Sequence, residues 1–342
     1  MGRSRERFHA AEYLVFAAVT AAVFCLCVCA GSVNIPLATT VRVILAALRG
    51  LPQESGTYSS IILTVRIPRV ICVALTGSAL SLAGAAMQGL LKNPLADGST
   101  LGVSSGASLG AVIAIAFGIS FPALPFTGTM VMAVLFAFGS LLLILGLAYR
   151  LDGSLSTNTI ILVGVIFSMF VSSVMNVIIT FSSEKIRSIT FWTMGSLQSS
   201  TMTNAAVLSV ALVAGSVILL SLCRELNAFA VGEENAGSIG VDIRKTKLTV
   251  LITVSVLIGV CVSIGGTIAF VGLVTPHMVR LLVGPNHRKL LPASLFGGAV
   301  FLMLSDLAAR VLLDPIELPI GVVTSIVGSV VFVIIFYHAR RR

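Results

Sequence analysis

The 342-residue chain is 57% hydrophobic and only 10% charged, and its formal net charge is +9. Because soluble domains carry about 25% charged residues, this composition excludes a soluble enzyme and predicts a protein embedded in lipid. The positive charge is typical of the cytoplasmic loops of a membrane protein, so it gives no reason to expect nucleic-acid binding.

Apolar runs long enough to cross a bilayer recur along the whole chain. With roughly 20 residues per span, we predict an all-α polytopic membrane protein with about ten transmembrane helices in a single domain, residues 1–342. The predicted spans are 12–31, 61–82, 94–118, 126–148, 157–181, 203–222, 246–265, 268–283, 291–313 and 318–338. The loop 32–60 would lie outside, with a short surface helix at 39–49.

Arginines stand at both ends of the chain, as Arg3, Arg5 and Arg7 and as Arg340, Arg341 and Arg342. An even number of spans places both ends on the same side of the membrane. The positive-inside rule then predicts that both termini are cytoplasmic.

Small residues recur at every fourth position in two neighbouring apolar segments. They are Gly77, Ser81, Ala85 and Gly89 in the first, and Gly102, Gly106 and Gly110 in the second. This spacing lets a neighbouring helix backbone come close inside a membrane. We therefore predict two tightly packed helices, joined by a short polar turn at Lys92-Asn93-Pro94.

Three of the arginines on the predicted outer side, Arg66, Arg69 and Arg310, lie at predicted helix ends. Arg66 and Arg69 are three residues apart in the predicted first turn of a helix, where the helix dipole opposes positive charge unless an anion meets it. They could receive carboxylates of an outside protein or reach lipid phosphates, and the residues alone favour neither. Arg310 ends the ninth span, and an internal ion pair with Asp306, one turn earlier, is a serious alternative for it.

The long polar loop on the inner side, residues 223–247, reads as two short helices. The first carries Leu226, Phe229 and Ala230 on one face, and the second runs from Gly232 through Glu233 and Glu234 to Gly240, a helix stop. An amphipathic element of this kind suits the groove of a soluble partner, although a solvated connector is the commoner fate of a loop.

Polar side chains form one line along the fifth span, at Ser168, Ser172, Asn176 and Thr180. Polar residues inside a membrane face a bundle interior or a water-filled cavity. The line could therefore border a translocation pathway or form hydrogen bonds between helices, and both readings stay open.

Several motifs are absent from the sequence. It has no G-x-x-x-x-G-K-[ST] nucleotide-binding loop, its four histidines show no metal-ligand spacing, and its six cysteines lie in or at the end of apolar runs. We therefore predict no metal site and no cofactor in this chain. Asp306 is the one carboxylate expected deep in the membrane, which argues against a proton relay.

Taken together, the motifs resemble the iron-chelate and cobalamin permease family of type II ATP-binding-cassette (ABC) importers. The matching stretches are RIPR (66–69), GAAMQGLLKNPLADGSTLGVSSGA (84–107), WTMGSL (192–197), LNAFAVGEENAGSIGV (226–241), GGTIAFVGLVTPHMVRLLVGPNHR (265–288) and SDLAAR (305–310). These stretches occur in the same order as in the family, and together they cover most of residues 60–312.

The resemblance implies the partners of the chain. A second permease subunit, either another copy or a related chain, would face it across a central pathway in the cytoplasmic membrane of a bacterium. Two separate ATPase subunits would bind ATP and magnesium, and an extracytoplasmic substrate-binding protein would deliver the cargo. The permease itself would contact lipid, bind no nucleic acid and catalyse no reaction.

The resemblance also implies roles for particular residues. Arg66, Arg69 and Arg310 would receive glutamates of the binding protein. Asn93, Leu95, Thr157 and Asn158 would form the cytoplasmic gate. The loop 224–245, with Leu226, Phe229, Gly232, Glu233, Glu234 and Gly240, would couple to the ATPase, and Ser168, Ser172 and Asn176 would line the pathway.

An iron(III)-siderophore is the first expectation for the cargo, with haem or cobalamin as alternatives. Two other classes of protein compete with the importer. One is a secondary transporter driven by an ion gradient, which would need no partner. The other is a structural or signalling membrane subunit, which would bind partners without moving solute.

Overall fold

The computed structural model describes residues 8–31, 33, 35–49, 56–121, 127–153 and 156–340, and the regular secondary structure of these residues is entirely helical. The first half holds α1 (Ala10–Cys29), α2 (Leu37–Leu48), α3 (Thr57–Ser60), the π-helical segment η1 (Ile61–Arg66), α4 (Ile67–Leu91), the 3-10 turn η2 (Gly98–Leu101), α5 (Val103–Phe117), α6 (Gly128–Leu151) and α7 (Thr157–Phe181). The second half holds the 3-10 turn η3 (Ser183–Lys185), α8 (Ile186–Thr193), α9 (Met202–Ser221), α10 (Cys223–Val231), α11 (Glu233–Ser238), α12 (Ile243–Gly265), α13 (Val271–Val283), α14 (His287–Val311) and α15 (Ile320–Arg340).

Each predicted span corresponds to a helix of the structure. Seven helices of the described chain are long and apolar enough to cross a membrane, and α5, α13 and α15 supply shorter apolar segments. The predicted surface helix at 39–49 is α2. The all-α prediction is therefore confirmed.

Two predicted helix starts are wrong. α3, η1 and α4 form one continuous helix, so Arg66 and Arg69 do not lie in a first turn and the helix-dipole argument does not apply to them. The third predicted span begins too early, because Lys92 ends α4 with a left-handed φ of 47° and α5 starts only after Gly102, which has φ 72°.

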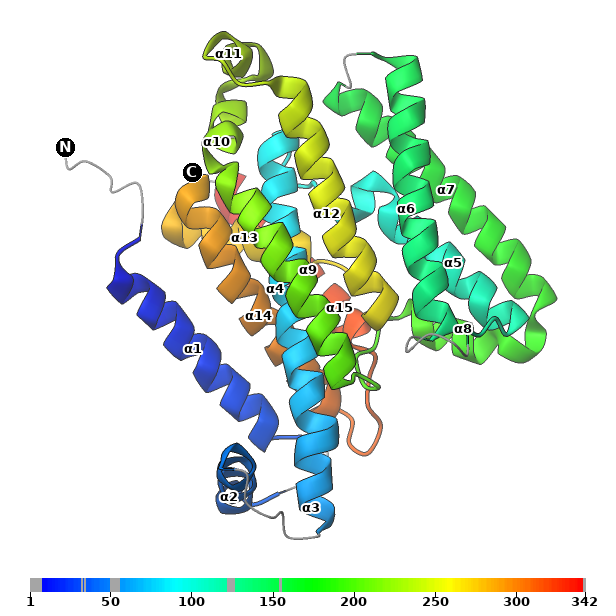
Figure 1. Ribbon diagram of the computed structural model, residues 1–342, viewed down its shortest axis with the longest axis vertical. Coiled ribbons are helices and arrows are strands. Elements are labelled where there is room, and N and C mark those ends of the chain that lie inside the picture. The colour runs from blue at the N-terminus through cyan, green and yellow to red at the C-terminus, as the bar shows by residue number, and fades with distance from the viewer. Residues whose placement is uncertain are drawn as a thin grey trace.

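Helix α4 lies at the centre of the bundle, packed against α14, α13, α12 and α9, while α5 packs against α6 and α7 (Figure 1). The α10–α11 loop lies at one end of the bundle, and α2 and α3 lie at the other (Figure 1). The arginines of the first seven residues and of the last two fall outside the described residues.

The two sets of small residues lie in close helix contacts, as predicted, but α4 and α5 each make these contacts with another helix. A Cβ built on Gly77 would overlap the backbone of Gly298 in α14, and one built on Gly110 would overlap the carbonyl of Met132 in α6. The two helices joined by the polar turn are thus each held tightly by another part of the chain.

Gly84 offers a direct test of this packing. A Cβ at Gly84 would overlap the carbonyl oxygen of Gly272 in α13, and backbone cannot move aside as a flexible side chain can. We expect Gly84→Ala to destabilise the detergent-solubilised chain by about 1–3 kcal/mol through overpacking, measured as a lower thermal-unfolding midpoint.

Gly139 in α6 provides the matched control, because a Cβ built there meets no atom within 4 Å. Gly139→Ala should leave the midpoint unchanged or raise it, since alanine suits a helix interior better than glycine by about 0.5–1 kcal/mol. Equal midpoints for the two variants would contradict the packing described here.

Candidate functional site

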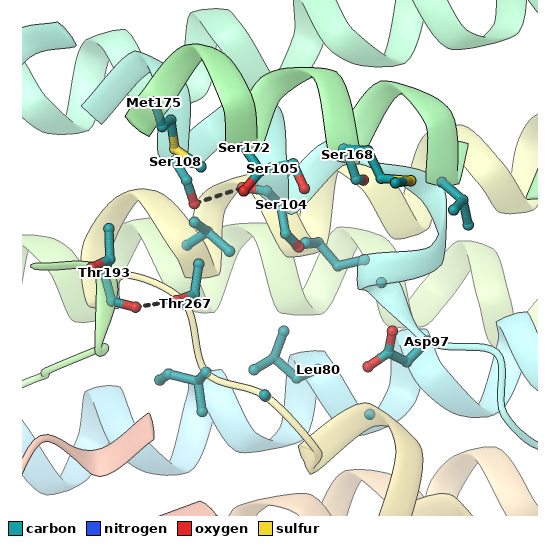
Figure 2. Close-up of a pocket in the computed structure, with 18 residues that line it drawn as sticks. Leu80, Asp97, Ser104, Ser105, Ser108, Ser168, Ser172, Met175, Thr193 and Thr267 are labelled. Carbon is teal, nitrogen blue, oxygen red and sulfur yellow. Dashed lines mark hydrogen bonds between the residues drawn. The ribbon is translucent and has the colours of Figure 1, made fainter. Parts of the chain in front are cut away.

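A cavity of about 610 Å³ opens between α5, α7, α12, the α12–α13 connection, the middle of α4 and the segment that follows α4 (Figure 2). Hydroxyl side chains from four segments line it: Ser104, Ser105 and Ser108 of α5, Ser168 and Ser172 of α7, Thr193 of α8, and Thr267 between α12 and α13. Apolar side chains such as Leu80, Met169 and Ile258 fill the spaces between them. The cavity can therefore accept hydrogen-bonding solutes.

The hydroxyl groups differ in how they are satisfied inside the protein. The Ser108 hydroxyl donates to the carbonyl of Ser104 at 2.9 Å, and the Thr267 hydroxyl donates to the carbonyl of Thr193 (Figure 2). The buried hydroxyl oxygen of Ser168 has no hydrogen-bond partner within the described structure. The oxygens can still accept hydrogen bonds from a solute.

The structure brings Ser168 and Ser172 to this cavity but not Asn176, which is exposed farther along α7. Sequence reasoning missed the hydroxyls of α5. Ser104, Ser105 and Ser108 lie between the packing glycines, and their spacing of one and four residues could have indicated a second, polar face.

Asp97, which the sequence analysis did not single out, also lines the cavity (Figure 2). It follows the predicted gate turn directly. In that turn the Asn93 side-chain oxygen accepts a hydrogen bond from the Leu95 amide at 2.9 Å, and the Leu95 side chain is 50% exposed. The turn thus lies where α4 ends and the cavity begins.

The inner loop forms the two predicted short helices, α10 and α11. Leu226 and Phe229 are fully buried against the chain's own core, so they anchor α10 and do not present an apolar face to a partner. That part of the sequence interpretation is wrong, because the amphipathic face is satisfied within the chain. Ala230, the third residue of the predicted face, is exposed, as are the apolar side chains of Val231 and Ile239.

Glycines shape this loop. Gly232 separates α10 from α11 with φ 140°, a conformation that residues with a side chain rarely adopt. Gly240, with φ 88°, follows the end of α11 at Ser238, as the predicted helix stop requires. The exposed Glu234 lies on α11 between them.

Glu233 joins the inner loop to two spanning helices. One carboxylate oxygen accepts a hydrogen bond from the Thr157 hydroxyl at 3.0 Å, and the other lies 2.7 Å from Lys247 Nζ. Thr157 is the first residue of α7, and Lys247 lies in the first turns of α12 with its side chain 2% exposed. A predicted coupling residue thus contacts a predicted gate residue. Asn158, beside Thr157, is exposed.

Arg66, Arg69 and Arg310 are buried and have partners inside the chain. The carboxylate of Asp306 lies 2.9 Å from both Arg69 and Arg310, and Arg69 also pairs with Glu317 at 2.7 Å. The Asp306–Arg310 pair left open by the sequence therefore exists.

Arg66 and Arg310 also hold the end of α1. Arg66 donates to the carbonyls of Val28 at 3.1 Å and Cys29 at 2.9 Å, and Arg310 donates to those of Cys27 at 3.1 Å and Ala30 at 3.0 Å. These are carbonyls that an α-helix leaves without partners at its C-terminus. Positive charge is also favourable at that end of the helix dipole.

Across the described ranges, no group of three or more His, Cys, Asp or Glu side chains could hold a metal ion. All six cysteines are thiols. A bundle of apolar helices around a hydroxyl-lined cavity, with a polar helical loop at one end, defines a membrane permease.

Comparison with known proteins agrees with this class. The model of the FecCD transport family matches residues 19–338. The uncharacterized ABC transporter permease protein YvrB of Bacillus subtilis (strain 168) is 39% identical over 333 residues, 97% of this chain and 94% of that protein. The cobalamin import system permease protein BtuC of Halobacterium salinarum is 37% identical over 283 residues, 83% of this chain and 74% of that protein.

A solved structure, described as an inward-facing metal-chelate type ABC transporter, superposes with a TM-score of 0.84 at 30% identity, covering 96% of this chain and all of that one. This chain belongs to the FecCD transport family. It is a membrane permease subunit of a type II ABC importer and not an enzyme, because ATP hydrolysis in such importers belongs to separate ATPase subunits.

Proposed function

We propose that the chain carries an iron(III)-siderophore across the cytoplasmic membrane, in an assembly with a second permease subunit, two ATPases and an extracytoplasmic binding protein. Haem or cobalamin would be the alternative cargo of the same machinery. The observation that carries the proposal is the hydroxyl-lined cavity of about 610 Å³ beside the Asn93–Leu95 turn, in a fold shared with a metal-chelate transporter.

In this proposal the ATPase binds α11 and moves it during the ATP cycle. The exposed Glu234 of α11, with Ile239 and Gly240 just after its end, would contact the ATPase. The buried Leu226 and Phe229 would keep α10 fixed to the bundle. Movement of α11 would reach α7 and α12 through Glu233. The cavity would then open or close at the Asn93–Leu95 turn, with Thr157 and Asn158 on the opposite helix.

The α10–α11 end would face the cytoplasm, so the arginine network would lie at the outer end. Direct docking of the binding protein on Arg66, Arg69 and Arg310 stays a prediction. Because these residues are only 3–6% exposed, we propose that they serve docking indirectly, by fixing the ends of α1, α4 and α14 beneath the docking surface.

Co-purification and uptake test the proposal together. A tagged permease should retain an ABC ATPase through purification, and the assembly in liposomes should accumulate iron-55 supplied as a ferric hydroxamate on its binding protein. Retention of the ATPase with uptake of haem or cobalamin alone would overturn the siderophore assignment and keep the importer. Absence of both ATPase and uptake would overturn the importer itself.

Asp97 gives the ion-coupled alternative its one supporting observation, since carboxylates inside membranes serve ion and proton pathways. That alternative predicts uptake by the permease alone, driven by a proton or sodium gradient.

A further inference from the structure

Helix α13 is interrupted near its start by a proline. Pro276 lies inside the helix and has no N–H for the carbonyl of Gly272, four residues earlier. The helix also begins abnormally, because Phe270 precedes it with φ 69°, a left-handed conformation that bulky residues rarely adopt. Inside a membrane, backbone groups that a proline releases must find partners elsewhere in the protein. The first turns of α13 therefore need support from a neighbouring helix.

Gln88 of α4 provides this support. Its side-chain nitrogen donates to the carbonyl of Leu273 at 3.0 Å and lies 3.5 Å from the carbonyl oxygen of Gly272. Its side-chain oxygen accepts a hydrogen bond from Arg280 at 2.9 Å. Because carbonyls only accept and a guanidinium only donates, these partners fix which way the amide points. The residue is only 3% exposed, so little water competes for these hydrogen bonds.

The contacts of this glutamine lie on both sides of Pro276. Leu273 and Arg280 are seven residues apart, which places them two turns apart on the same face of the helix. One side chain thus bridges the interruption, from the turn before the proline to the turn after it. The two backbones are close enough for this because Gly84, one turn earlier in α4, has no Cβ to overlap the carbonyl oxygen of Gly272.

This bridge joins two parts of the proposed transport path. Gln88 lies five residues before the gate turn at Asn93–Leu95, and Gly272 lines the cavity. We propose that Gln88 is a positioning residue, which compensates for the missing N–H of Pro276 and so fixes the cavity wall at the start of α13 to the end of α4. The gate turn and this wall then move as one unit. The inference rests on the proposed function, in which that turn is the gate.

A double-mutant cycle tests the bridge. Gln88→Met keeps the size of the side chain and removes both of its hydrogen-bonding groups, whereas Pro276→Ala restores the N–H that the helix lacks. We expect Gln88→Met to lower the thermal-unfolding midpoint of the full-length chain in detergent by about 2–4 °C. It should also lower the ferric hydroxamate moved per ATP by the reconstituted assembly by about 5-fold or more. In the Pro276→Ala background, both losses should shrink to about half or less.

Pro292→Ala supplies the matched control background, because Pro292 lies inside α14 and Gln88 makes its hydrogen bonds to α13. There Gln88→Met should lose as much as in the parent. Equal losses in the parent and in the Pro276→Ala background, or no loss in the parent, would overturn the proposal. Midpoints that follow the expected pattern with an unchanged ratio of cargo to ATP would also overturn it, because Gln88 would then serve stability alone.

Hydrogen–deuterium exchange gives a second measurement, which needs no proline variant. Gln88→Met should speed amide exchange in α13 by about 5-fold or more and leave α12 unchanged, because the loss of the bridge lets the first turns of α13 open. Unchanged exchange in α13 would overturn the proposal. A parent assembly that moves no cargo would remove the proposed function, whereas exchange and midpoints would still decide whether Gln88 holds α13.

Discussion

Asp306→Ala is expected to destabilise the folded chain by about 3–5 kcal/mol, because it leaves two buried guanidinium groups without their shared anion. Asp306 is 1% exposed and lies 2.9 Å from both Arg69 and Arg310. A loss of this size is a large part of the roughly 5–15 kcal/mol that stabilises a folded domain. The measurement is the yield of monodisperse protein and its thermal-unfolding midpoint in detergent.

Glu317→Gln is the matched control. Glu317 also pairs with Arg69, at 2.7 Å, but its side chain is 21% exposed, so water can replace part of the interaction. We expect a loss of at most about 1 kcal/mol, in the range of exposed ion pairs. If Asp306→Ala were no more harmful than Glu317→Gln, Asp306 would not organise the end of the bundle where α1, α4 and α14 meet.

The ion pairs of Arg69 and Arg310 with Asp306 change how docking of a binding protein on these arginines can be tested. Reversal of Arg66, Arg69 and Arg310 to glutamate would be the direct test of docking, because it replaces the three cations by anions. In the structure, a glutamate at 310 would face Asp306 and the carbonyls of α1, so it would also damage the fold. Binding of the outer protein must therefore be measured on variants whose unfolding midpoint is unchanged.

Glu233→Ala is expected to lower the cargo moved per ATP hydrolysed by about 10-fold or more. It removes both the hydrogen bond to Thr157 at 3.0 Å and the ion pair with Lys247 at 2.7 Å. Hydrogen bonds to charged groups contribute about 1.5–3 kcal/mol each, and 1.4 kcal/mol is tenfold in an equilibrium constant. The measurement is uptake and ATP hydrolysis by the same reconstituted assembly.

Glu234→Ala is the neighbouring control, since Glu234 is exposed on the same helix. It should retain the coupling ratio, even if it weakens ATPase binding. Thr157→Ser should also retain the ratio and Thr157→Val should lower it, because serine keeps the hydroxyl that reaches Glu233. Equal ratios for Glu233→Ala and the parent would show that α11 does not act on the gate through this carboxylate.

Much of the fold follows from local pattern. The apolar runs located the spans, and the four-residue spacing of Gly77 to Gly89 identified a face where backbones meet. Helix starts were less predictable. The helix before Arg66 begins at Thr57, in a segment whose polar residues read as loop, and packing against the rest of the bundle maintains it.

The sequence could not predict that these charged side chains are buried and paired with one another. RIPR and SDLAAR are 235 or more residues apart, and no local rule brings Arg69 to Asp306. Part of the cavity lining could be predicted, because Ser168 and Ser172 recur at a spacing of four residues on one face of α7. Asp97 and Thr267 could not be predicted, because they line the same cavity from turns whose path depends on tertiary packing.

The central claim is that this permease moves cargo only when a separate ATPase drives it. Proteoliposomes that hold the permease, its ATPase and its binding protein, compared with proteoliposomes that hold the permease alone under a proton or sodium gradient, test this most directly. The account predicts accumulation of a ferric hydroxamate against its gradient in the first sample, dependent on ATP, and none in the second. Uphill accumulation by the permease alone would contradict it.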